Sequence, residues 1–324
     1  MNNISLGRAW SLATSFFSGL AGPHAIILIV VGILIPSVLG WAVVGGSMSG
    51  MMNPAALASG EMMAGLGAGF LVVSLVTYVL QYGSYFASWR QGLAGGDESV
   101  GGALTYGLIA GAVITGIFIA TVLVFALLVG VTQSPWVFVP ALLIIIPLFA
   151  MLAPAFMGLL SIVMLLLAAF GSFAMSAVLG QMGMGDEVGM GGGAILLILI
   201  LAFLFVWLGA RLSCAAPLMA HRKSYNPIDA MKSSWAMTAT SQWKIVGYLM
   251  LIGLVLLVLV FLASMILGAG MMGAMQSGDM GGGSIVSVLL FSLLISIPMA
   301  YLTVAIPGGI YKELGGDSTA QTFA

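Results

Sequence analysis

The sequence is poor in charged residues and in cysteine. Only 5% of the 324 residues are charged and 61% are hydrophobic, whereas soluble globular domains are about 25% charged. A net charge of -1 offers no basic field for nucleic acid. The single cysteine, Cys214, excludes an intramolecular disulfide and a cysteine-based zinc site, and we expect it to pack as a small apolar side chain. These deficits, with a mean hydropathy of +1.21, indicate an integral membrane protein.

Long apolar runs predict an all-α, polytopic transmembrane helical bundle, with residues 1–324 forming a single integral membrane domain. We expect about eight spans, at 25–44, 65–88, 103–131, two within 136–179, 194–210, 245–268 and 284–306. The first run suits a span of about 20 residues better than a signal peptide, whose apolar core has about 7–15. Residues 1–20 are expected to form an amphipathic helix at the membrane interface.

Residues 136–179 carry no charge and would measure about 66 Å as one helix, about twice the hydrocarbon core. We expect them to fold back at Ala153 and Pro154, because the residue before a proline avoids the helical region. Six spans remain possible if this part forms a re-entrant hairpin. Gly107 and Gly111 have the GxxxG spacing that allows helices to approach closely.

The distribution of basic residues predicts the orientation of the chain. Arg8, Arg90, the stretch 211–244 and Lys312 are expected on one side of the membrane. The Gly- and Met-rich loops at 46–63, 182–193 and 270–283 contain no Lys or Arg and belong on the other side. The positive-inside rule then places both termini in the cytoplasm and the protein in the cell (inner) membrane.

The order of features also predicts an internal duplication, with units at 10–97 and 235–317 around four central spans at 103–210. Each unit begins with a tryptophan, Trp10 or Trp235, in an interfacial segment. A span, an outside loop with paired methionines and a second span follow, before a cation and a Gly-Gly-Asp sequence. Two spans in each unit would insert both units in the same orientation.

The stretch 211–244 holds five of the eight basic residues. Cations interleaved with tryptophans are typical of a membrane surface, where each cation attracts anionic lipid by about 1 kcal/mol. The alternative is that these cations only fix the orientation of the chain in the membrane. The candidate contacts with lipid or a protein partner are Arg211, Arg222, Lys223, Lys232, Trp235, Trp243 and Lys244.

We predict no catalytic, cofactor or metal site. The charged residues fall in loops or at span ends, which disfavours proton-coupled transport and intramembrane hydrolysis. His24 and His221 have no nucleophile or ligand partner at a recognisable spacing, and Asp97 and Glu98 are expected to be solvated loop charges. We therefore expect a non-enzymatic protein that contacts membrane lipids or a cytoplasmic protein partner.

Two other functions stay open. The proline-interrupted central spans would suit a transporter or channel for a neutral or lipid-like solute. In addition, twelve of the 23 methionines lie in the expected outside loops, and thioethers favour Cu(I). Methionine is also a flexible apolar filler, so Cu(I) handling and loop packing are both consistent with these residues.

A resemblance adds to this interpretation. The run from Arg211 to Pro217, followed by residues 226–235 and then Trp243-Lys244, resembles a bacterial family, the membrane domain associated with glycerophosphoryl diester phosphodiesterases. Residues 4–10 also resemble the N-termini of that family. Its members often place a carboxylate near the position of His221, so the match is imperfect there. The resemblance implies a polytopic membrane module and not phosphodiesterase activity, which belongs to a separate soluble domain.

Overall fold

The structure is a computed structural model and describes residues 4–40, 42, 61–94, 97–134, 138–166, 192–277 and 282–315. Every regular element among these residues is a helix, and this confirms the all-α prediction. The helices of the first half are α1 (Leu6–Ser15), α2 (Ala21–Ala25), η1 (Ile26–Leu34), α5 (Glu61–Leu93), α6 (Val100–Thr132) and α7 (Phe138–Leu152). Those of the second half are α9 (Gly192–Leu212), α10 (Ala215–His221), α11 (Pro227–Thr238), α12 (Gln242–Ser277) and α13 (Gly282–Glu313).

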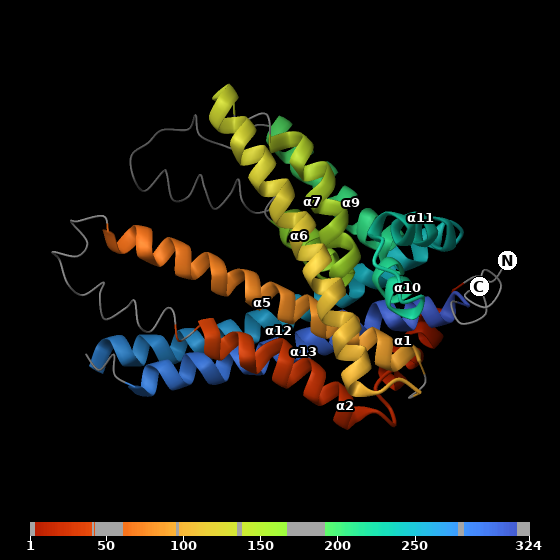
Figure 1. Cartoon of the computed structure of the whole chain (residues 1–324), viewed down its shortest axis with the longest axis horizontal. Coiled ribbons are helices and arrows are strands. Elements are labelled where there is room, and N and C mark those ends of the chain that lie inside the picture. The colour runs from red at the N-terminus through yellow and green to blue at the C-terminus, as the bar shows by residue number, and fades with distance from the viewer. Residues whose placement is uncertain are drawn as a thin grey trace.

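The long helices form two groups that diverge from one end of the molecule (Figure 1). Helices η1, α5, α12 and α13 run together in one direction, while α6, α7 and α9 run together in another. The short helices α10 and α11 lie where the two groups converge, and α1 lies near the same end. This arrangement brings the polar ends of several long helices together.

Five of the described helices are long and apolar enough to cross a membrane, and a bent pair would make a sixth. They are Ala21–Gly40, Val100–Thr132, Ile195–His221, Gln242–Leu262 and Leu293–Glu313. These helices confirm the polytopic bundle. The expected span 65–88 is helical in α5 but is not one of these five, so the count of eight stays a prediction.

The bent pair lies where the sequence predicts a turn. Helices Pro140–Leu152 and Pro154–Leu166 meet at an angle of 116°, and Ala153 between them is not helical. The predicted break before Pro154 is therefore confirmed. Residues 167–179 of the expected hairpin lie outside the described part of the chain.

The expected Gly- and Met-rich loops are shorter than predicted. Helix α12 continues to Ser277 and α13 begins at Gly282, so the predicted loop 270–283 is wrong over most of its length. Methionine and alanine are good helix formers and can extend a helix across isolated glycines. Helix α5 likewise begins at Glu61, inside the first expected loop. The loop methionines at 48–52, 182–190 and 280 lie outside the described residues.

A tightly packed buried core holds α5 against its neighbours. Trp89 is fully buried, and its Nε1 donates a hydrogen bond of 2.8 Å to the carbonyl oxygen of Val304 in α13. On the other side of α5, a Cβ at Gly107 would collide with the carbonyl oxygen of Gly83, and one at Gly111 would lie 2.6 Å from the nitrogen of Gly83. The predicted close approach at Gly107 and Gly111 is therefore confirmed. Cys214 is buried as expected.

A methyl group at Gly111 should force α5 and α6 apart. Its Cβ would also lie 2.8 Å from the carbonyl oxygen of Val79, and overpacking of this kind typically costs about 1–3 kcal/mol. We expect Gly111→Ala to lower the midpoint of thermal unfolding in detergent. Gly116 on the same helix has nothing within 4 Å of a built Cβ, so Gly116→Ala is the matched control and should not lower it. Equal losses in the two variants would contradict close packing at Gly111.

Candidate functional site

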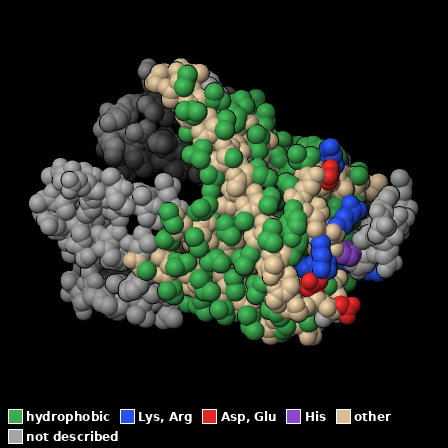
Figure 2. Space-filling view, viewed as in Figure 1, with side chains coloured by type: hydrophobic (Ala, Val, Ile, Leu, Met, Phe, Trp, Pro, Cys, Tyr) green, Lys and Arg blue, Asp and Glu red, His purple; other side chains and the backbone are tan. Residues whose placement is uncertain are grey.

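Charged side chains gather at the end of the molecule where the two helix groups converge (Figure 2). Arg8 pairs there with Glu313 at the end of α13, with Nε 3.0 Å from Oε2. Lys244 at the start of α12 donates from Nζ to the carbonyl oxygen of Ile4 at 3.3 Å. The N-terminal segment, the basic stretch and the end of α13 thus lie at one end of the molecule, as the charge distribution predicts.

Arg90 joins three segments at this end. Its Nε and Nη2 donate to Oε2 of Glu98 at 3.0 and 2.7 Å. Its Nη1 donates to the carbonyl oxygens of His221 at 2.8 Å and Ala220 at 3.3 Å, in the last turn of α10. The planar guanidinium suits this use because its donors point in fixed directions. Lys223 completes the group, with Nζ 3.0 Å from the same carboxylate oxygen.

Glu98 is therefore a paired carboxylate, and the prediction that it is a solvated loop charge is wrong. Its side chain is 15% exposed and contacts two cations. Hydrogen bonds from Arg90 and then from Lys223 hold the pKa of the Glu98 carboxyl below its usual range. The neighbouring Asp97 is exposed, as predicted.

The turn between α10 and α11 sets the direction of the basic stretch. Lys223 has a left-handed backbone, with φ of 52°, and reverses the chain after α10. Tyr106 of α6 fixes the next residue by donating from its hydroxyl to the carbonyl oxygen of Ser224 at 3.0 Å. Asn226 then caps α11, since its Oδ1 accepts from the backbone nitrogen of Ile228 at 3.1 Å. Local turn chemistry and one long-range hydrogen bond therefore place α11.

Helix α11 is amphipathic and buries its small polar side chains. Ser234 and Thr238 donate from their hydroxyls to the carbonyl oxygen of Arg211 at 2.9 and 3.1 Å. The opposite face exposes Ile228, Lys232 and Trp235. An exposed face that mixes a cation with large apolar side chains is typical of a helix lying in a membrane interface.

Arg211 lies beneath that exposed face. Its residue surface is only 7% exposed, and its guanidinium carbon lies 4.3 Å from the centroid of the Trp235 ring. Trp207 packs edge-on against Trp235 from α9, with centroids 5.2 Å apart. Within the described part of the chain, no carboxylate pairs with Arg211, and its buried Nε has no hydrogen-bond partner. A cation–π contact alone leaves this guanidinium incompletely compensated.

The seven predicted contact residues do not form one cluster. Arg211 and Trp235 are in contact, and Lys223 and Lys244 are held by Glu98 and by the backbone of Ile4. The exposed side chains of Arg222 and Lys232 make no hydrogen bond or ion pair with any described residue. Trp243 is 60% exposed and lies 6.1 Å from the ring of Phe203.

The two histidines contact hydroxyl groups. His24 is buried, with Nδ1 3.3 Å from the Ser88 hydroxyl oxygen. His221 has Nδ1 2.9 Å from the hydroxyl oxygen of Tyr311. Among the described residues, no group of three or more His, Cys, Asp or Glu side chains could hold a metal ion.

Sequence reasoning missed Arg90 and Glu98 as part of this site. One signal was available, because the two opposite charges flank a short polar turn between two long apolar helices. Their contact with Lys223, 125 residues from Glu98, depends on the tertiary arrangement and had no local signal.

A comparison with known families gives a match for part of the chain at the charged end of the molecule. Residues 190–314 match the membrane domain of glycerophosphoryl diester phosphodiesterase. The resemblance predicted for the basic stretch is thereby confirmed, whereas residues 4–10 lie outside the match. No curated protein and no solved structure matched the chain.

The matched segment includes α9 to α13 and all seven predicted contact residues. Arg90 and Glu98 lie outside the matched segment, in the first half of the chain. The contact between Glu98 and Lys223 therefore joins the matched segment to residues that precede it.

Loss of the Glu98 charge should destabilise the fold in a pH-dependent way. Because the folded-state pKa lies below the unfolded-state value, the pairing stabilises the protein above the unfolded-state pKa. This contribution is lost as the pH falls through the folded-state pKa. At neutral pH, Glu98→Gln should cost about 1.5–3 kcal/mol, measured by thermal unfolding in detergent.

The acid dependence supplies the control for this prediction. Wild type should lose stability on acidification over a range in which Glu98→Gln loses less. Asp97→Asn removes an exposed neighbouring charge and should behave like wild type. An identical acid loss in wild type and Glu98→Gln would show that the pairing does not stabilise the fold.

Proposed function

We propose that this polytopic membrane protein holds its basic stretch, residues 211–244, against the anionic head groups of the membrane. On this proposal the charged end faces the cytoplasm, both termini lie on that side, and the protein resides in the cell (inner) membrane. The excess of cations at this end supports that orientation through the positive-inside rule.

Arg211 is the observation that carries the proposal. A buried guanidinium without a carboxylate partner is costly unless another group compensates its charge. Arg211 lies in the last turn of α9, where an apolar helix ends, and Trp235 covers it. On this proposal the end of α9 lies at the level of the lipid phosphates, and arginine binds phosphate with two parallel hydrogen bonds. A lipid phosphate at the rim of Trp235 would supply the missing negative charge.

The exposed face of α11 also suits contact with an anionic lipid. Ile228 and Trp235 can enter the boundary between head groups and acyl chains, while Lys232 stays at the level of the phosphates. Trp243, which begins the next membrane helix, lies in the place that interfacial tryptophans favour. Each unpaired cation near an anionic surface contributes about 1 kcal/mol, so Arg222 and Lys232 should contribute more than Lys223, which is already paired with Glu98.

We propose further that the protein acts without catalysis of its own. The part of the chain that matches the phosphodiesterase family is its membrane domain. A protein partner that uses the same cations is the competing interpretation of the basic stretch.

Lipid binding by the purified protein tests this proposal. Native mass spectrometry of the protein in detergent, with phosphatidylglycerol or phosphatidylcholine added, measures the preference for the anionic lipid. Arg222→Gln with Lys232→Gln should lower that preference about tenfold or more. Arg8→Gln removes an exposed cation already paired with Glu313 and should have a smaller effect. An unchanged preference in the double variant, or loss of a copurifying protein alone, would contradict the lipid proposal.

Arg211→Met separates a binding role from a structural one. A buried guanidinium without a carboxylate partner is costly to desolvate, and an apolar side chain of similar length removes that cost. We therefore expect this variant to keep or raise its thermal stability in detergent while losing preference for phosphatidylglycerol. A variant with unchanged lipid preference would show that the Arg211 charge does not serve lipid binding.

A further inference from the structure

A polar-lined cavity lies within the apolar part of the molecule, away from the charged end. It occupies about 230 Å³ between η1 with the residues that follow it, α5 and α13. Its lining residues are Gly32, Ile33, Pro36, Ser37, Gln81, Tyr85, Ile295, Ser296 and Met299. The sequence suggested a solute site among the central spans at 103–210, and this cavity lies outside them.

The cavity lies beside helices that can span a membrane. Two of its walls belong to Ala21–Gly40 and Leu293–Glu313, which are long and apolar enough to span a membrane. Gln81 precedes Arg90 by nine residues, which is about 14 Å along a helix. A polar group at this depth has little water to bond with, and an unmet hydrogen bond there is costly.

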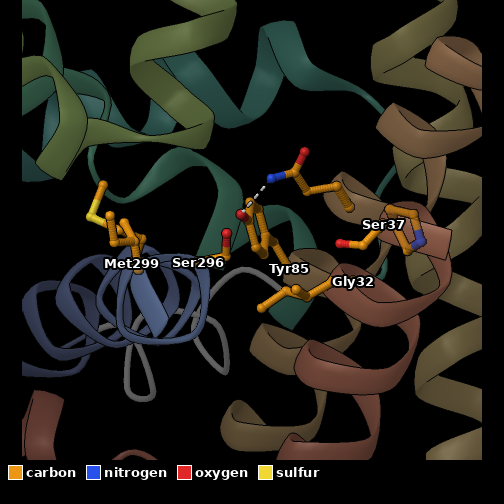
Figure 3. Close-up of a pocket in the computed structure, with 9 residues that line it drawn as sticks. Gly32, Ser37, Tyr85, Ser296 and Met299 are labelled. Carbon is orange, nitrogen blue, oxygen red and sulfur yellow. Dashed lines mark hydrogen bonds between the residues drawn. The ribbon is translucent and has the colours of Figure 1, made fainter. Parts of the chain in front are cut away.

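Several polar groups of the lining have spare hydrogen-bonding capacity. Tyr85 accepts a hydrogen bond of 3.1 Å from Nε2 of Gln81, so the hydroxyl hydrogen of Tyr85 and the Oε1 of Gln81 are left for other partners. Figure 3 shows Ser37 and Ser296 on either side of Tyr85. Neither serine side chain makes a hydrogen bond to another described residue. The lining thus offers donors and acceptors together.

The backbone around Gly32 shapes one wall. Helix η1 is π-helical, with the nitrogen of Ile35 bonded to the carbonyl oxygen of Val30, and Pro36 has no N–H for the turn before it. A Cβ at Gly32 would collide with the Ser84 hydroxyl of α5, so glycine allows the two helices to meet beside the cavity. Irregular helical turns of this kind are frequent at functional sites.

We propose that this cavity binds the uncharged polar end of a neutral glycerolipid, such as the hydroxyl and ester groups of a diacylglycerol. The nine lining residues carry no charge, which disfavours a phosphate. The volume is below the range of about 300–1,000 Å³ typical of whole drug-sized ligands, so a head group fits and the acyl chains extend into the bilayer. Ile33, Ile295 and Met299 supply apolar contacts for the chain ends nearest the ester groups.

Photocrosslinking in lipid nanodiscs tests this site. The probe is a diacylglycerol with a diazirine near the ester group, in discs of phosphatidylcholine, with crosslinked peptides identified by mass spectrometry. Crosslinks should concentrate at residues 32–37, 81–85 and 295–299. Unlabelled diacylglycerol should displace the probe. Displacement by free glycerol would instead assign the cavity to a soluble polyol and overturn the lipid proposal.

Variants of the lining make the test specific. Ser296→Leu fills the cavity, and Tyr85→Phe removes one donor with little change of volume, so each should lower crosslinking at these residues about fivefold or more. Ser264→Leu on α12 is the matched control, because this exposed serine bonds only the carbonyl oxygen of Val260 in its own helix. Crosslinks spread evenly over the exposed apolar faces, or unaffected by both lining variants, would overturn the proposal.

Discussion

The contact of Arg90 with Glu98 and with the end of α10 is the constraint on which the charged end depends. It ties the last turn of α5 to the turn before α6 and to the short helix that leads into the basic stretch. Lys223 shares the same carboxylate, so the position of α11 follows from residues in the first half of the chain. Arg90, at the end of an apolar helix, thereby holds together polar segments that would be unstable in the membrane interior.

The cations at this end divide into two groups with different roles. Arg8, Arg90, Lys223, Lys244 and Lys312 are occupied by carboxylates or backbone carbonyls of the protein. Arg222, Lys232 and Arg211 have no such partner among the described residues. This division gives the proposed lipid recognition a physical basis that net charge alone does not provide, because the whole chain carries only -1.

Much of the helical architecture could be predicted from the sequence, because long apolar runs and isolated prolines act locally. The break at Ala153 and the close approach at Gly111 followed from such local rules. The length of α12 could not be predicted in this way, since glycine- and methionine-rich sequence is compatible with both loop and helix. The pairing of Glu98 and the burial of Arg211 also escaped prediction, because both depend on contacts between distant segments. The proposed duplication of units 10–97 and 235–317 stays a prediction.

The depth of α11 in a bilayer tests the central claim most directly. A nitroxide attached at Ile228→Cys, in a Cys214→Ala background, reports that depth by electron paramagnetic resonance from its relative exposure to oxygen and to a water-soluble nickel complex. Ile228 is on the exposed face of α11 with Lys232. In phosphatidylglycerol-containing nanodiscs the account predicts a label about 5–10 Å below the head groups, more accessible to oxygen than to nickel. A label fully accessible to nickel would show that α11 faces water, and would contradict the account.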